Sequence, residues 1–390
     1  MTREPSPRVV LAPDKFKGSA SAPEVADALA TGVVRAVPAA RIHRVPVADG
    51  GDGTVDAFVT AGWRRVELVA PGPTGAAVPT SYAVRGDTAV VELAAVSGAA
   101  KLPAGRFDPL GAGTEGLGTV LAHALESGAR HLVLGLGGSA SSDGGAGMLR
   151  GLGARILDAR GNELPPGGAA LADAARLDAG GLHPLLRRAR LTLACDVDNP
   201  LLGPAGAVAV YGPQKGAGPA ELVILEAALT NWARVVGEAF PVERYGDAGV
   251  RPGAGAAGGT GFGVLGALAV LMPVTVRSGI DVVLELLGFA DLVNGAALVV
   301  TGEGSFDEQS LRGKAPLGVL AAATAAGVPC VVTPGRSLLT AEQVREAGFA
   351  GCHPLTELEP DPARCMAQAR PLLVHLGERI AEHYLRARVQ

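Results

Sequence analysis

Residues 135–147 read Gly135-Leu136-Gly137-Gly138-Ser139-Ala140-Ser141-Ser142-Asp143-Gly144-Gly145-Ala146-Gly147, between a predicted strand at 131–136 and a predicted helix at 147–157. Glycines let backbone N–H groups converge on an anion, serines add hydroxyl donors, and the following helix adds the positive end of its dipole. We therefore expect a loop that binds a di- or triphosphate, against the alternative of a surface turn in a glycine-rich chain. The expected phosphate-binding residues are Gly137, Gly138, Ser139, Ser141 and Asp143.

The same alternation of strand, loop and helix recurs towards both ends of the chain. Ser21 and Glu24 form a capping box, which predicts a helix over 22–36. Further strands are expected at 8–12, 42–47, 191–195, 297–301 and 330–333, and further helices at 54–61, 115–127, 219–239, 315–326, 341–347 and 362–387, the last with a break near Pro371. This alternation favours an α/β fold with parallel, helix-covered strands.

The alternation of strands and helices is interrupted between residues 66 and 97. Three short segments there, at 66–69, 81–84 and 88–93, resemble antiparallel strands with a hairpin turn at Gly86-Asp87. We expect two α/β domains. The first combines residues 1–70 with 285–390, and the second, with a mixed sheet, is residues 71–284 inserted between them.

Composition excludes several classes of protein. The formal net charge of −4 provides no basic surface for nucleic acid or an anionic membrane. Residues 253–276 carry no charge, but their dense apolar part, 262–272, is too short to span a bilayer and predicts a buried helix instead. The four cysteines have no CxxC spacing and the N-terminus has no secretory leader, so we expect a reduced, cytoplasmic protein.

Carboxylates follow several predicted strands. Asp196 comes after the strand at 191–195, Asp49 and Asp52 follow the strand at 42–47, and Glu303 follows the strand at 297–301. Ligands of open α/β sheets bind outside the carboxyl ends of strands. There a carboxylate can accept a hydroxyl proton or bind Mg²⁺, although each could also be a turn or a helix cap.

Lysines are scarce, and four of the five lie in loops beside Gly, Pro or Asp: Lys15, Lys17, Lys215 and Lys314. A compact ammonium on a flexible stem suits phosphate or carboxylate binding. The loop 211–216 that carries Lys215 is expected to follow a strand.

Two common nucleotide-binding motifs are absent from the sequence. The chance GxGxxG matches lack the preceding strand, the following helix and the acidic residue of a dinucleotide-binding fold. Gly313-Lys314 is not followed by Ser or Thr, as a Walker A motif requires.

Eight motifs, in order along the chain, resemble those of the bacterial glycerate kinases. They are APDKFKGS at 12–19, VPVADGGDGT at 45–54, GLGGSASSDGGAGM at 135–148, ACDVDNPL at 194–201, GPQKG at 212–216, PGAGAAGGTG at 252–261, SGID at 278–281 and TGEGSFDEQSLRGK at 301–314. The sequence departs from the usual pattern at Lys15, Asp52, Ser305 and the turn Pro334-Gly335.

The resemblance implies a two-domain α/β enzyme, one domain flavodoxin-like, that phosphorylates D-glycerate with ATP and Mg²⁺. The branch it resembles is associated with 2-phosphoglycerate, and 3-phosphoglycerate stays possible.

The expected roles combine this resemblance with the chemistry of the loops. The catalytic candidates are Asp196 and Lys17, and Gly258 and Gly259 join the phosphate-binding loop. The substrate-binding candidates are Asp14, Lys15, Asn199 and Lys215, and the metal-binding candidates are Asp49, Asp52 and Glu303.

Two alternatives remain open from the residues themselves. Asp196-Val197-Asp198 after a strand resembles the nucleophile motif of HAD phosphatases, although Pro200 stands where that motif has Thr or Val. A regulator that binds a hydroxy acid without turnover would use the same fold.

Overall fold

The computed structural model describes residues 6–104, 106–241, 247–311 and 313–385. The chain divides into two compact units: unit 1 is residues 1–49, 56–62 and 280–390, and unit 2 is residues 50–55 and 63–279. The division of the sequence at 70 and 285 into independently folding domains stays a prediction.

Unit 1 contains a five-stranded sheet in the order β15-β13-β11-β1-β2, and each neighbouring pair is parallel. Counted within the unit, this is the 2-1-3-4-5 order of flavodoxin-like folds. Its strands are β1 (Arg8–Pro13), β2 (Arg41–Arg44), β11 (Leu298–Gly302), β13 (Cys330–Val332) and β15 (Gly351–Cys352), with the short pair β12 (Ser305–Phe306) and β14 (Arg336–Ser337) beside them.

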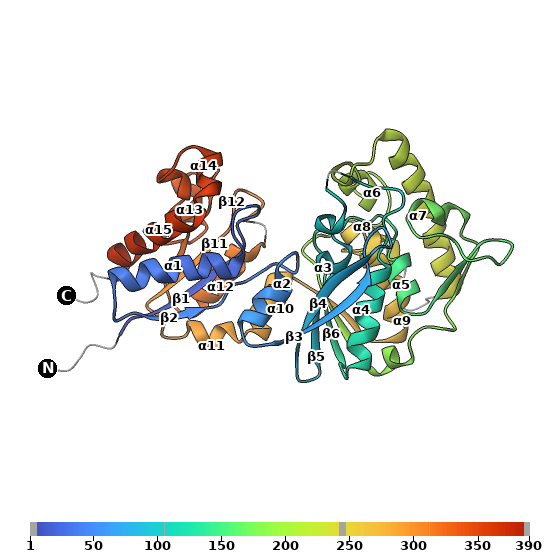
Figure 1. Ribbon diagram of the computed structural model, residues 1–390, viewed down its shortest axis with the longest axis horizontal. Coiled ribbons are helices and arrows are strands. Elements are labelled where there is room, and N and C mark those ends of the chain that lie inside the picture. The colour runs from blue at the N-terminus through green and yellow to red at the C-terminus, as the bar shows by residue number, and fades with distance from the viewer. Residues whose placement is uncertain (1–5, 105, 242–246, 312, 386–390) are drawn as a thin grey trace. The chain divides into compact units, whose positions relative to one another are not determined.

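Helices cover this sheet (Figure 1). α1 (Ala22–Ala36) begins at the predicted Ser21–Glu24 capping box and packs along α15 (Ala369–Tyr384), and the apolar faces of both helices close over β1 and β11. α12 (Ala315–Ala325) contacts β1, β11 and β13. The remaining helices are α2 (Thr54–Thr60), α10 (Gly279–Leu286), α11 (Phe289–Val293), α13 (Ala341–Glu346), η7 (Leu355–Glu357) and α14 (Pro362–Ala367).

Unit 2 contains a six-stranded mixed sheet in the order β10-β9-β6-β5-β4-β3. The first four strands are parallel, whereas β4 runs antiparallel to both β5 and β3. The strands are β3 (Arg64–Pro71), β4 (Ala77–Arg85), β5 (Thr88–Glu92), β6 (His131–Gly135), β9 (Arg190–Ala194) and β10 (Val274–Arg277), and β7 (Arg155–Leu157) and β8 (Arg176–Asp178) form a separate hairpin.

The helices of unit 2 are α3 (Ala94–Ser97), η1 (Ala99–Lys101), α4 (Glu115–Glu126), α5 (Ala146–Gly151), η2 (Ala169–Asp173), η3 (Pro184–Arg188), α6 (Ala207–Tyr211), η4 (Pro213–Lys215), α7 (Pro219–Ala239), η5 (Ala248–Val250), α8 (Ala256–Gly263), the π-helical η6 (Val264–Leu268) and α9 (Ala269–Leu271). The dense apolar part of the uncharged segment, 262–272, is thus a mostly buried helical stretch, as expected. Among the described residues, no helix has the length and apolar character needed to cross a membrane.

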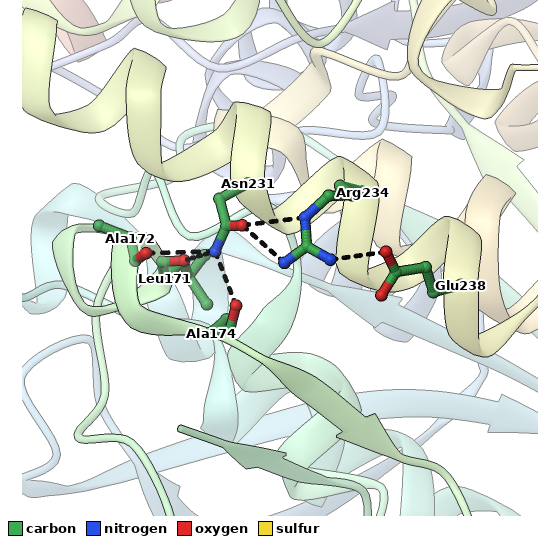
Figure 2. Close-up of polar contacts among 6 residues, drawn as sticks. All are labelled: Leu171, Ala172, Ala174, Asn231, Arg234 and Glu238. Carbon is green, nitrogen blue, oxygen red and sulfur yellow. Dashed lines mark hydrogen bonds and ion pairs between the residues drawn. The ribbon is translucent and has the colours of Figure 1, made fainter. Parts of the chain in front are cut away.

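One side chain of the long helix α7, that of Asn231, bonds to the end of η2 (Figure 2). The Asn231 amide donates to the carbonyl oxygens of Leu171 and Ala174, both at 2.8 Å, and of Ala172 at 3.2 Å. Its own oxygen accepts hydrogen bonds from Arg234. These carbonyl groups lie at the C-terminal end of the short helix η2, where Asn231 supplies donors to them.

Two predicted elements are wrong, and the position of a third feature is refined. The helix expected over 147–157 ends at Gly151, because Gly153 adopts a positive φ of 104° and the chain then forms β7. The loop 211–216 follows the helix α6 and not a strand. The break expected near Pro371 is confirmed and lies at Gln368, between α14 and α15, so that Pro371 falls in the first turn of α15.

Candidate active site

Four parallel strands of unit 2 end in one row. Glu92 at the end of β5 lies opposite Gly135 of β6, which lies opposite Ala194 of β9, which in turn lies opposite Arg277 of β10. The loop that follows β6 and the segment 195–200 that follows β9 therefore begin side by side at the carboxyl edge of the sheet. This edge is where open α/β sheets bind ligands.

Residues 136–145, here called the glycine loop, follow β6. Their conformation is held by Asp143, which is buried and accepts from the Thr114 N–H and hydroxyl, both at 2.8 Å, and from the N–H groups of Gly145 and Gly147. Burial raises the pKa of this carboxyl, and these hydrogen bonds oppose the shift. Asp143 thus anchors the loop. The sequence predicted neither this anchoring role nor the partner residue Thr114.

The other predicted loop residues lie along its first half. The Gly138 carbonyl accepts from the Ala99 N–H, and Ser139 pairs with Gly98, so segment 97–99 supports the loop. The hydroxyl oxygens of Ser141 and Ser142 are buried and have no hydrogen-bond partner in the described part of the chain. Both hydroxyl groups therefore have unused hydrogen-bonding capacity.

The segment 50–53 lies against the same strand ends. A Cβ atom on Gly135 would overlap the carbonyl oxygen of Gly50, so this close approach requires glycine. The carboxylate of Glu92 accepts from the N–H groups of Gly53 and Val55. Asp52 is exposed on this segment. Sequence reasoning missed Glu92, although an acidic residue at the end of a strand is the signal that identified Asp196.

Asp196 lies directly beyond the end of β9, with its side chain exposed and its Oδ1 accepting the Gly279 N–H at 2.9 Å. Asn199 is used differently. Its amide donates to the carbonyl oxygen of Ala205 and accepts from the Tyr211 hydroxyl at 2.6 Å. The protein therefore engages both ends of the Asn199 amide, whereas Asp196 is an exposed residue.

Residues 257–259, here called the glycine turn, have three successive positive φ angles: Ala257 at 52°, Gly258 at 68° and Gly259 at 87°. Lys215 is buried beside this turn, and its Nζ donates to the carbonyl oxygen of Ser141. Burial lowers the pKa of Lys215 to about 8, because the charged form loses its hydration, and the negative charge of Asp143 partly opposes this effect.

In unit 1, the predicted residues lie at the point where the strand order reverses, between β1 and β11. The N–H of Asp14 donates to the carbonyl oxygen of Gly302 at 2.8 Å, which places the loop after β1 beside the loop after β11 that carries Glu303. Asp14 is buried and forms an ion pair with Lys15 at 3.7 Å, whereas Lys17 is exposed. Flavodoxin-like folds bind ligands at this switch point.

Glu303 is the perturbed carboxyl of unit 1. It is 9% exposed, its Oε1 has no hydrogen-bond partner among the described residues, and burial raises its pKa to about 7. A buried oxygen in this state fits a cation. Asp49 is half-buried in the same unit. In the described ranges, no group of three or more His, Cys, Asp or Glu is arranged to hold a metal ion. Mg²⁺ typically takes one or two carboxylates plus substrate phosphates, so Glu303 fits that pattern.

Comparison with known proteins identifies the family. The model of the glycerate kinase family matches residues 9–385. The chain belongs to the glycerate kinase family. It is 44% identical to a glycerate kinase of Bacillus subtilis, over 83% of this chain and 84% of the relative. It is also 44% identical to a glycerate 2-kinase of Escherichia coli K12, over 80% and 81%.

A solved structure from Salmonella typhimurium LT2, assigned as a glycerate kinase 2, superposes with a TM-score of 0.83 at 35% identity, covering 99% of this chain and 100% of the other. The predicted family, and the α/β class with one parallel and one mixed sheet, are confirmed. The HAD-like phosphatase and the non-catalytic regulator gain no support from these glycerate kinase relatives.

Proposed function

We propose that the protein transfers the terminal phosphoryl group of ATP to the 2-hydroxyl of D-glycerate, giving 2-phosphoglycerate and ADP. The family assignment and the Escherichia coli relative named glycerate 2-kinase support this reaction. The structural observation that carries it is the row of strand ends in unit 2. Gly135 and Ala194 are paired residues at the ends of β6 and β9, so the glycine loop and the segment with Asp196 begin side by side.

The glycine loop and the glycine turn bind the phosphates of ATP. The loop offers the hydroxyls of Ser139, Ser141 and Ser142, and the buried ammonium of Lys215 adds a positive charge beside it. Asp143 contributes by anchoring the loop from behind, since its carboxylate already accepts four hydrogen bonds from the protein. Phosphoryl transfer depends mainly on such positioning and charge neutralisation.

Asp196 is the general base. Its carboxylate takes the proton from the attacking hydroxyl of glycerate as that oxygen forms its bond to the terminal phosphorus of ATP, and ADP departs. The Gly279 N–H holds Oδ1 at 2.9 Å and thereby fixes the orientation of the carboxylate. Exposure leaves the group accessible to substrate.

Unit 1 contributes charged side chains at its switch point. Within unit 1, Lys17 is the candidate for contact with a phosphoryl group, and Asp14 and Lys15 are the candidates for binding glycerate. Glu303 and Asp49 are the carboxylates of unit 1 that could hold Mg²⁺, and Asp52 is the corresponding candidate of unit 2. Mg²⁺ would supply neutralisation of charge on the phosphate oxygens. Asn199 and Lys215 act through their protein partners instead of as direct glycerate ligands.

The test is ATP-dependent turnover of D-glycerate, with and without Mg²⁺, with enolase as the coupling enzyme. We expect ADP release and an immediate enolase-dependent signal. A signal that needs phosphoglycerate mutase first would identify 3-phosphoglycerate as the product. Absence of ADP release by the folded protein would refute the proposal.

Since ATP is a cytoplasmic nucleotide, we propose the cytoplasm as the site of action.

A further inference from the structure

Lys215 is a buried lysine inside unit 2. It ends the short helix η4, and the next residue, Gly216, takes a positive φ of 89° that turns the chain away. The residue is only 6% exposed. A buried ammonium loses its hydration, so it persists only where the fold supplies compensating groups.

The ammonium lies between two segments that are far apart in sequence. Its Nζ donates to the carbonyl oxygen of Ser141 in the glycine loop. A Cβ atom on Gly258 would lie 2.8 Å from the same Nζ and would overlap the Ser141 carbonyl oxygen. The glycine turn is therefore packed onto the Lys215–Ser141 contact, and residue 258 must be glycine for that contact to form.

Two further contacts join the same segments. The Gly144 N–H donates to the carbonyl oxygen of Gly258 at 3.0 Å, and a Cβ atom on Gly259 would lie 2.9 Å from the Cα atom of Gly144. The loop and the turn thus meet at both Ser141 and Gly144. At Ser141, the ammonium of Lys215 is the only charged group in the described part of the chain that is hydrogen-bonded to the carbonyl oxygen.

The charge of Lys215 is only partly compensated by the protein. An ammonium has three donors, and the Ser141 carbonyl oxygen is its one hydrogen-bond acceptor among the residues that the structure describes. Asp143 stabilises the charged form electrostatically, but its carboxylate accepts hydrogen bonds from Thr114, Gly145 and Gly147. Lys215 thus has donor capacity beyond its bond to Ser141, beside a loop whose Ser141 and Ser142 hydroxyls also lack partners among the described residues.

We propose that Lys215 is a positioning residue for nucleotide binding: its ammonium joins the glycine loop to the glycine turn and so sets the positions of the Ser141 and Ser142 hydroxyls for phosphate. This inference rests on the proposed phosphate-binding function of the loop. It assigns Lys215 to the nucleotide, and not to the carboxylate of glycerate.

The test compares Lys215→Met with wild type in steady-state kinetics. Loss of the hydrogen bond to a charged donor should raise the KM for ATP about 10- to 100-fold, while the KM for glycerate stays within about 3-fold. A merely structural role would reduce the amount of active enzyme, and so the apparent kcat, without changing the KM for ATP. A raised KM for glycerate alone would overturn the proposal, as would an unchanged KM for ATP.

Two further variants sharpen this comparison. Lys101→Met is the matched control, because Lys101 also donates to a backbone carbonyl oxygen in unit 2, that of Pro79, and we expect unchanged KM values. Lys215→Gln keeps a donor without the charge and should give an intermediate KM for ATP. If Lys215→Met does not fold, Lys215→Gln decides the question by the same criteria.

Hydrogen exchange of the wild-type protein requires no variant. Addition of ATP should protect the amides of 257–259 together with those of 138–147, whereas protection confined to 138–147 would refute the coupling. Failure of the proposed function has a different signature: wild type would then bind ATP, as measured by calorimetry, without releasing ADP in the presence of glycerate.

Discussion

The buried carboxylate of Glu92 accepts the N–H groups of Gly53 at 3.1 Å and Val55 at 3.0 Å. One side chain at the end of β5 thus holds the segment that carries Asp52 against the strand ends of unit 2. A carboxylate can accept both hydrogen bonds, whereas an amide has only one accepting atom.

Glu92→Gln should therefore leave one of these N–H groups facing an NH₂ group. We expect a loss of about 1–3 kcal/mol in the free energy of unfolding, measured by urea denaturation. Glu126→Gln changes a carboxylate that is 64% exposed and should cost less than about 0.5 kcal/mol. Equal effects of the two substitutions would show that Glu92 does not hold the segment.

Asp196→Asn should lower kcat about 10²- to 10⁴-fold, because the amide cannot accept the proton while its oxygen can still accept the Gly279 N–H. The KM values should change little. Asp198→Asn alters an exposed carboxylate in the same loop and should stay within a few-fold of wild type. A near-normal kcat for Asp196→Asn would remove this residue from the mechanism.

Ser141→Ala should affect stability and nucleotide binding in opposite directions. Removal of a buried hydroxyl without a partner should leave the free energy of unfolding unchanged or raise it by up to about 1 kcal/mol. The KM for ATP should rise about 5- to 50-fold, because the phosphate loses a donor. Ser97→Ala removes another buried, unpartnered hydroxyl and should leave that KM unchanged. Identical KM values in both variants would contradict the assignment of Ser141.

Glu303 makes stability depend on pH, because burial raises its pKa from 4.5 to about 7. A carboxyl raised in this way stabilises the fold fully below the unfolded pKa, and the contribution is lost as the pH rises through the folded value. In metal-free protein, Glu303→Gln should therefore gain stability relative to wild type from about pH 5 to pH 8, on the order of 2 kcal/mol. Denaturation at both pH values measures this difference, and Glu308→Gln, exposed in the same loop, should show none.

Asn231→Asp removes the donors for three carbonyl oxygens of η2 and places a negative charge beside them (Figure 2). We expect it to cost more than Asn231→Ala, which should lose about 1–3 kcal/mol in denaturant unfolding. Arg234→Ala breaks only an exposed ion pair with Glu238 and the bonds to the Asn231 oxygen, so it should cost less than about 1 kcal/mol. A larger effect at Arg234 than at Asn231 would contradict this account.

Local signals in the sequence predicted most elements of the fold. The Ser21–Glu24 capping box correctly placed α1 over 22–36, and helix α7 begins and ends at the predicted residues, 219 and 239. The predicted helix beyond Gly151 was wrong because the positive φ of Gly153 is a backbone property that apolar periodicity does not report. The short strands β7 and β8 are stabilised by each other, and their pairing is not visible in either segment alone.

The sequence points to Asp196 and Glu303 as site candidates because a carboxylate and a strand end coincide there, and their roles stay predictions. Contacts between residues distant in sequence could not be predicted. Thr114 meets Asp143 across 29 positions, and Lys215 meets Ser141 across 74. Nothing near Thr114 or Lys215 in the sequence specifies these partners, because the tertiary fold alone brings them together.

The position of β1 between β2 and β11 in unit 1 has a consequence for synthesis on the ribosome. β1 ends at Pro13, but its parallel neighbour β11 begins only at Leu298, after all of unit 2 has been made. At about 5–20 residues per second, this apolar strand waits roughly 15–60 s for that partner. During this interval the nascent chain presents an incomplete sheet edge, which makes β1 a candidate for chaperone binding before translation ends.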